Sequence, residues 1–228
     1  MRTRILLLVL LLSNSFIYAH DVASADHELL INGGLWAYLW VGAKHMLTGY
    51  DHLLFLTGVV FYLSKFSDIV KFISAFTLGH SITLIAATFL QIEVNEYLID
   101  AVIGFSVFYK GFENLGGFKT IGVKAPNLLL MVTLFGFIHG LGLSARLQSL
   151  HLGEEQVLLK ILSFNLGVEL GQVTALIPIL YIIKFLRTQK AYDSLYKAIN
   201  SYLLVAGIAL LGYQLYKYFA LFYFSQIV

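Results

Sequence analysis

The chain of 228 residues contains no cysteine and only two prolines, and charged residues make up just 12% of it. Without cysteine there are no disulfides, no thiolate metal ligands and no thiol nucleophiles. A soluble domain carries about 25% charged residues, so this chain has about half the usual supply of solvated surface. Arg2 and Arg4 account for the formal net charge of +2. The composition therefore argues against a soluble enzyme, a nucleic-acid-binding protein and a disulfide-stabilised secreted domain.

Hydrophobic residues are what the chain has in excess, at 59% of the sequence. They form near-continuous stretches of about 20 residues, the length that a helix needs to cross a bilayer. We predict an all-α fold, a polytopic bundle of about six transmembrane helices in contact with the lipid bilayer. The expected spans are residues 35–63, 70–91, 96–112, 127–147, 157–186 and 198–222. The third is short and the fifth is long, which allows for tilt or a broken segment.

The N-terminus has the pattern of a secretory signal peptide over residues 1–19. Arg2 and Arg4 precede the apolar run 5–12, and Ala19 ends the segment. We expect cleavage after Ala19, with an uncleaved signal anchor as the alternative. Residues 20–34 would then be a short exported segment, followed by a six-helix transmembrane domain over residues 35–228.

Basic residues in the loops predict the orientation in the membrane, because lysine and arginine concentrate on the cytoplasmic side. One set of loops holds nine of them: Lys65, Lys71, Lys110, Lys119, Lys124, Lys184, Arg187, Lys190 and Lys197. The opposite set holds Arg146 and Lys160, and also His151, which we interpret as part of a solvated loop. The mature N-terminus and the C-terminus are therefore expected outside the cytoplasm, in an integral protein of the bacterial inner (plasma) membrane.

Ionisable side chains inside four of the spans are the candidate site, because each costs a few kcal/mol in a membrane unless it is paired, hydrated or metal-bound. They lie at comparable depths and are the expected metal ligands: His45, Asp51, His52, His80, His139 and Glu169. Imidazole and carboxylate without thiolate suit Ni²⁺, Co²⁺, Zn²⁺, Fe²⁺ or Mn²⁺ better than Cu⁺. Ser81, Asn165 and Gln172 are expected to support the site, and Asn165, Glu169 and Gln172 to form one polar stripe facing the interior.

The spacing of the first three candidates sets a condition on a shared site. His45 and His52 are two helical turns apart, on one face but separated by about 10 Å along the axis. They can bind one ion only if the helix bends or unwinds, and Gly49 offers a place for this; otherwise they are two successive stops. Asp51 could bind the ion directly or orient an imidazole of a neighbouring helix through its ring N–H. The glycines around His139 predict close helix packing there.

Four segments together resemble the HupE/UreJ family. His45-Met-Leu-Thr-Gly-Tyr-Asp51-His52 is similar to its His-x5-Asp-His element, and the segments 76–84, 135–142 and 164–172 resemble its later elements in the same order. The likeness covers roughly residues 35–186. It implies a polytopic membrane protein associated with nickel or cobalt permeation, with His45, Asp51, His52 and His80 on the metal path. Met46 stands where better-studied members have proline, and the last two elements look closer to a second, less characterised branch.

These observations predict a permease for a divalent transition-metal cation, with nickel or cobalt as substrate and zinc as a further candidate. Two alternatives stay open: an intramembrane zinc-dependent hydrolase and a non-transporting metal-binding accessory protein. No P-loop is present, so transport would draw on a gradient, a coupled ion or a partner chain. The sequence is compatible with a homo-oligomer or a partner membrane protein. No catalytic residue and no nucleic-acid partner is predicted.

Overall fold

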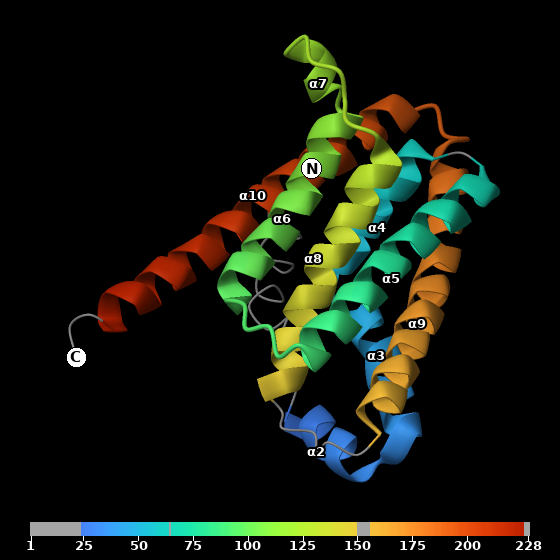
Figure 1. Cartoon of the computed structure of the whole chain (residues 1–228). Helices are drawn as coiled ribbons and strands as arrows, with labels where there is room; N and C mark the ends of the chain where they lie inside the picture. The colour runs from blue at the N-terminus through green and yellow to red at the C-terminus, as the bar shows by residue number, and fades with distance from the viewer. Residues whose placement is uncertain (1–23, 64, 150–155, 226–228) are drawn as a thin grey trace.

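The computed structural model describes residues 24–63, 65–149 and 156–225, and over these ranges all regular secondary structure is helical (Figure 1). The predicted all-α fold is confirmed. The helices are α2 (Ser24–Asn32), α3 (Gly34–Thr48), α4 (Tyr50–Tyr62), α5 (Phe66–Phe89), α6 (Glu96–Asn114), α7 (Gly117–Thr120), α8 (Leu128–Ser149), α9 (Val157–Leu186) and α10 (Tyr192–Ser225). The predicted signal peptide and the loop with His151 lie outside the described residues.

Four of the described helices are long and apolar enough to cross a membrane: Phe66–Phe89, Leu128–Gln148, Val157–Leu186 and Tyr192–Leu221. They correspond to the second, fourth, fifth and sixth predicted spans. The third predicted span is α6, which has 19 residues and includes four charged ones, Glu96, Asp100, Lys110 and Glu113. The first is divided into α3 and α4. The protein is therefore an integral membrane protein with a helical bundle.

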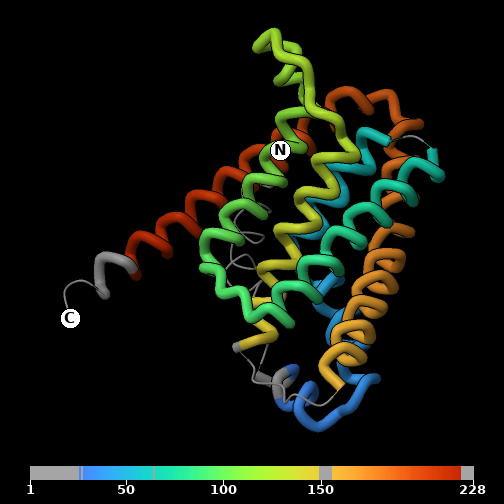
Figure 2. The backbone as a smooth tube through the Cα atoms, viewed as in Figure 1, coloured from blue at the N-terminus to red at the C-terminus, as the bar shows by residue number. Residues whose placement is uncertain are grey.

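The bundle is assembled from three closely packed helix pairs, α3 with α9, α5 with α8, and α6 with α10. The traces of α5 and α8 run side by side through the centre (Figure 2). Glycines permit this approach, because a Cβ on Gly136 would fall on the backbone oxygen of Phe76, and one on Gly140 would fall on that of His80. The hydroxyl of Thr83 donates to the Phe137 carbonyl at 2.7 Å across the same interface. The close packing predicted around His139 is thus confirmed.

Lys110, which the sequence placed among the cytoplasmic loop lysines, lies inside α6 and is only 1% exposed. Its Nζ donates to Oε2 of Glu113 at 2.6 Å and lies 4.6 Å from the centre of the Tyr62 ring. A lysine that is neutralised by a carboxylate one turn away can be buried, so its position in sequence does not mark a loop. The assignment of Lys110 to a loop was wrong.

A second buried ion pair joins α6 to α8. Nη2 of Arg146 donates to both carboxylate oxygens of Asp100 at 2.8 Å, and Nε2 of Gln214 on α10 donates to Asp100 at 3.3 Å. Asp100 and Arg146 are 7% and 9% exposed. The Asp100 carboxylate thus links three helices, α6, α8 and α10.

Removing the Asp100 carboxylate should strongly destabilise the bundle. We expect Asp100→Ala to lower the free energy of unfolding by about 3–5 kcal/mol, because it leaves the Arg146 guanidinium buried without its main counter-charge. Unfolding of the detergent-solubilised protein by denaturant measures this. Asp193→Ala, which changes an exposed residue at the start of α10, is the control. Equal stability of the two variants would contradict the structural role of the pair.

Candidate metal site

A break in the first predicted span brings the first two histidines together. α3 ends at Thr48 and α4 begins at Tyr50, and Gly49 between them has φ −71° and ψ 98°, which is outside the helical region. The ring centroids of His45 and His52 are 5.1 Å apart, whereas two turns of unbroken helix would separate the residues by about 10 Å. The bend that a shared site requires is therefore present, at the glycine where the sequence allowed it.

The centre of the site is formed by Asp51 and His52 at the start of α4 and by His139 in the middle of α8. One potential ligand atom from each of these three side chains lies within 4.8 Å of the other two. The ring centroids of His52 and His139 are 4.9 Å apart, and the three residues are 1%, 6% and 3% exposed. Two imidazoles and a carboxylate are thus gathered in a buried place, where an ion could bind to them with little competition from water.

Hydrogen bonds hold both imidazoles in place. Nδ1 of His139 lies 2.6 Å from the Phe135 carbonyl, so in the neutral ring this nitrogen donates its proton and Nε2 keeps a free lone pair. Nε2 of His139 is buried and has no hydrogen-bond partner, which is costly unless a ligand occupies it. Nδ1 of His52 lies 3.0 Å from Oδ1 of Asp51. Such contacts fix the ring tautomer and orientation in metal sites.

Asp51 therefore contacts an imidazole, as the sequence suggested, and the ring at hydrogen-bond distance is that of its own neighbour in the chain, His52. His52 follows directly after Asp51 at the first turn of α4, where the extended backbone at Gly49 leads into the helix. This arrangement leaves both roles of Asp51 available. It can orient His52 through one oxygen and face an ion with its carboxylate.

His80 lies beside this centre without joining the three-residue group. It is 2% exposed, and its Nδ1 has no hydrogen-bond partner. The ring of Phe76 contacts both histidines of the α5–α8 pair, with centroid distances of 6.3 Å to His80 and 4.9 Å to His139. The side-chain amide of Asn165 is likewise buried, and it interacts with His80. Buried polar groups are thus concentrated around the candidate site.

The remaining sequence candidates are placed differently. Gln172 is buried and accepts a hydrogen bond from Thr77 at 2.9 Å, whereas Ser81 is only partly buried. Glu169 is exposed, so the prediction that it faces the interior together with Asn165 and Gln172 was wrong. The cause is the packing of α9, which turns one side of the predicted stripe inward and leaves the other uncovered. His45 is partly exposed, and its ring centroid lies 6.0 Å from that of Phe164.

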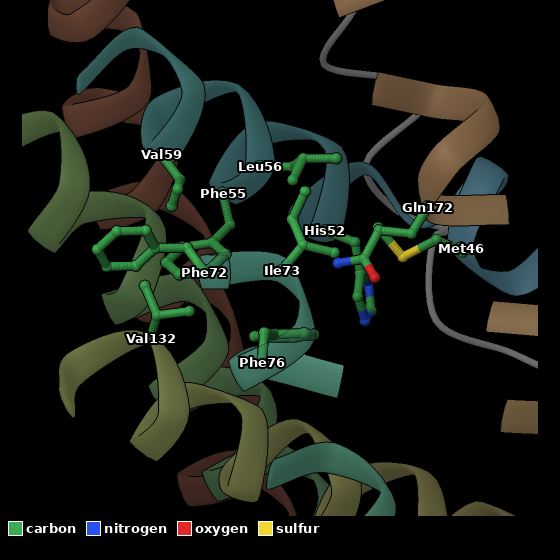
Figure 3. Close-up of a pocket in the computed structure, with 10 residues that line it drawn as sticks. All are labelled: Met46, His52, Phe55, Leu56, Val59, Phe72, Ile73, Phe76, Val132 and Gln172. Atoms are coloured by element: carbon green, nitrogen blue, oxygen red, sulfur yellow. The ribbon is translucent and has the colours of Figure 1, made fainter. Parts of the chain in front are cut away.

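An apolar pocket adjoins the site and was missed from the sequence. At one end it is lined by His52, Met46 and Gln172 (Figure 3). The rest of its wall is apolar, and we define six of these residues as the apolar collar: Phe55, Val59, Phe72, Ile73, Phe76 and Val132. Apolar residues on membrane helices are too common for their sequence to signal a pocket; only the proximity of α4, α5 and α8 assembles it.

Comparison with known proteins shows which family the chain belongs to. The model of the HupE / UreJ protein family matches residues 23–222. No curated protein and no solved structure matches the chain. The match covers the broken first span, the three residues of the centre and every other candidate ligand. The chain therefore belongs to the HupE/UreJ family.

Proposed function

We propose that the protein is a permease for a divalent transition-metal cation, and that Asp51, His52 and His139 bind the ion inside the membrane. The observation that carries this proposal is the buried group of two imidazoles and one carboxylate, with potential ligand atoms within 4.8 Å of one another. Ionisable groups in a membrane bundle mark ion and substrate paths by default, because their burial is costly. The family, which is associated with nickel and cobalt handling, supports the same proposal.

The chemistry of the donors defines the substrate class. Nitrogen and oxygen donors without sulfur from cysteine suit borderline divalent ions, with Ni²⁺ and Co²⁺ as the proposed substrates and Zn²⁺ as a competitor. Three protein donors leave coordination positions for water or for further residues. Because the protein supplies only three of the ligands, the bound ion can be released again. Permeation requires a site that releases its ion.

The positions of His45 and His80 suggest an order of events. His45 is partly exposed and lies 5.1 Å from His52 between ring centroids, so we propose that it receives the ion before the buried centre. His80, buried beside Phe76, would take part after or together with His139. In the predicted orientation, the ion enters from the outside face of the bacterial inner membrane and leaves to the cytoplasm.

Uptake by the purified protein in liposomes tests the proposal. We expect saturable uptake of Ni²⁺ or Co²⁺, reported by a metal-sensitive dye inside the vesicles, in competition with Zn²⁺. Vesicles with His139→Ala should show no more uptake than vesicles without protein, because the variant lacks one of three donors. His80→Ala should also abolish uptake without unfolding the protein.

Two results would contradict the proposal, the first its transport activity and the second its site. Tight metal binding without any uptake would favour the non-transporting accessory protein, or a zinc-dependent hydrolase whose peptide or lipid substrate would then be sought. Uptake that is unchanged in both the His139→Ala and the His80→Ala variants would show that the ion does not pass through this site.

A further inference from the structure

The apolar collar lies on one side of the metal site, toward one end of the bundle. Val59 follows His52 on α4 by two helical turns, and Val132 precedes His139 on α8 by the same interval, which is about 10 Å along each helix. Phe72 precedes His80 on the antiparallel α5 by slightly more. Val59, Val132 and Phe72 therefore lie toward the end of the bundle where α4 ends and Lys65 and Lys71 follow in the sequence. This end is predicted to be cytoplasmic.

Aromatic rings close the collar directly against the histidines. The ring centroid of Phe55 lies 5.9 Å from that of Phe76, 5.7 Å from that of Phe135 and 6.3 Å from that of His139. Phe55, Phe76, Val59 and Val132 are all at most 5% exposed. Figure 3 shows the polar groups of His52 and Gln172 at one end of the pocket and only hydrocarbon side chains beyond them.

Such a passage is a barrier to ions. Apolar cavities of this kind stay dry, and hydrophobic constrictions in channels close by losing water. A divalent cation that leaves the imidazoles toward this end meets the hydrocarbon side chains of the collar. It gives up its imidazole ligands without regaining water, and this cost applies to Ni²⁺ and Co²⁺ as well as to Mg²⁺.

We propose that the apolar collar is a hydrophobic gate of the permease toward the predicted cytoplasmic end. It is closed in the described conformation and stops hydrated divalent cations, Mg²⁺ and Ca²⁺ included. An ion bound to the histidines leaves toward this end only when the collar widens and admits water. The inference rests on the proposed function, since it assigns a closing element to the same path.

A polar residue in the collar should make the closed gate leak hydrated ions. We expect Val59→Asn, which lets water into the passage, to raise Mg²⁺ flux into liposomes by at least about 10-fold over the natural chain. The Ni²⁺ affinity in detergent should stay within about twofold, because Val59 lies about 10 Å from His52. Val59→Leu, which keeps the wall apolar, is the matched control and should leave Mg²⁺ flux at its original level. Unchanged Mg²⁺ flux in a Val59→Asn protein that still binds Ni²⁺ would overturn the proposal.

A labelling experiment decides the same point without transport and without the asparagine variant. Because the chain has no cysteine, a single introduced cysteine is the only thiol. Val59→Cys should resist a charged, water-soluble methanethiosulfonate reagent, whereas Tyr62→Cys, one turn further along α4 at a position that is 55% exposed, should react. Equal labelling of the two would refute a dry collar. If Val59→Cys is protected but the natural chain takes up no metal, the barrier stands and the proposed permease function fails.

Discussion

Replacing either imidazole of the buried centre with alanine is expected to lower the affinity for Ni²⁺ or Co²⁺ by at least about 100-fold. Asp51, His52 and His139 offer one ligand atom each within 4.8 Å, and no other described His, Asp or Glu belongs to this group. His52→Ala and His139→Ala therefore each remove a third of the donor set. The packing around the site should survive, because the lost ring leaves a space that water can fill.

Titration of the purified protein with metal measures the affinity, and the absorption bands of bound Co²⁺ report whether nitrogen donors coordinate it. His80→Ala is the informative comparison, since His80 is buried but lies outside the three-residue group. It should reduce affinity by no more than about 10-fold while abolishing uptake. If His52→Ala and His139→Ala bind the ion as tightly as the natural chain, the centre has been assigned to the wrong residues.

Replacing Gly49 with alanine should damage the site almost as much, although glycine binds no metal. The backbone angles at Gly49, φ −71° and ψ 98°, are open to alanine, so the effect comes from the added methyl group. Its Cβ would lie 2.7 Å from Nδ1 of His52, 3.0 Å from the His45 carbonyl oxygen and 3.2 Å from Oδ1 of Asp51. The imidazole must turn away, and the 3.0 Å contact between Asp51 and His52 must break.

We expect Gly49→Ala to lower metal affinity by about 10- to 100-fold, the usual cost of losing a group that orients a ligand. The same titration measures it, together with the melting temperature, which separates a local displacement from unfolding. Gly212→Ala on α10 is the matched control, because a Cβ there would meet nothing within 4 Å. Natural affinity in Gly49→Ala would show that the geometry of the break does not control the site.

Much of the fold was predictable from hydropathy alone. The fifth span was predicted over residues 157–186, which are the bounds of α9, and the third was predicted to begin at Glu96, where α6 begins. Helix length in a membrane follows from bilayer thickness, so local sequence is enough to find the spans. Lys110 was wrongly assigned to a loop because its burial depends on a partner. Its charge is compensated by Glu113, and a hydropathy pattern does not show which buried side chains form an ion pair.

The site was predictable as a list of ligands but not as a geometry. His52, His139 and Asp51 were expected because ionisable groups at one depth in a membrane require a reason. Glu169 met the same criterion and is exposed, because rotation of α9 about its axis depends on glycine contacts with α3. A Cβ on Gly167, for example, would fall on the backbone oxygen of Leu39.

The sequence by itself determined that this protein is an all-α membrane bundle, which residues in it are costly to bury, and that a bend at Gly49 was the condition for a shared site. These are local properties, set by the transfer of each side chain and backbone group from water to lipid. The tertiary structure alone decided that the bend exists, that His52 meets His139 from another helix, and that apolar residues of α4, α5 and α8 form a collar beside them. Contacts between helices depend on how their surfaces fit, and that fit is a property of the whole bundle.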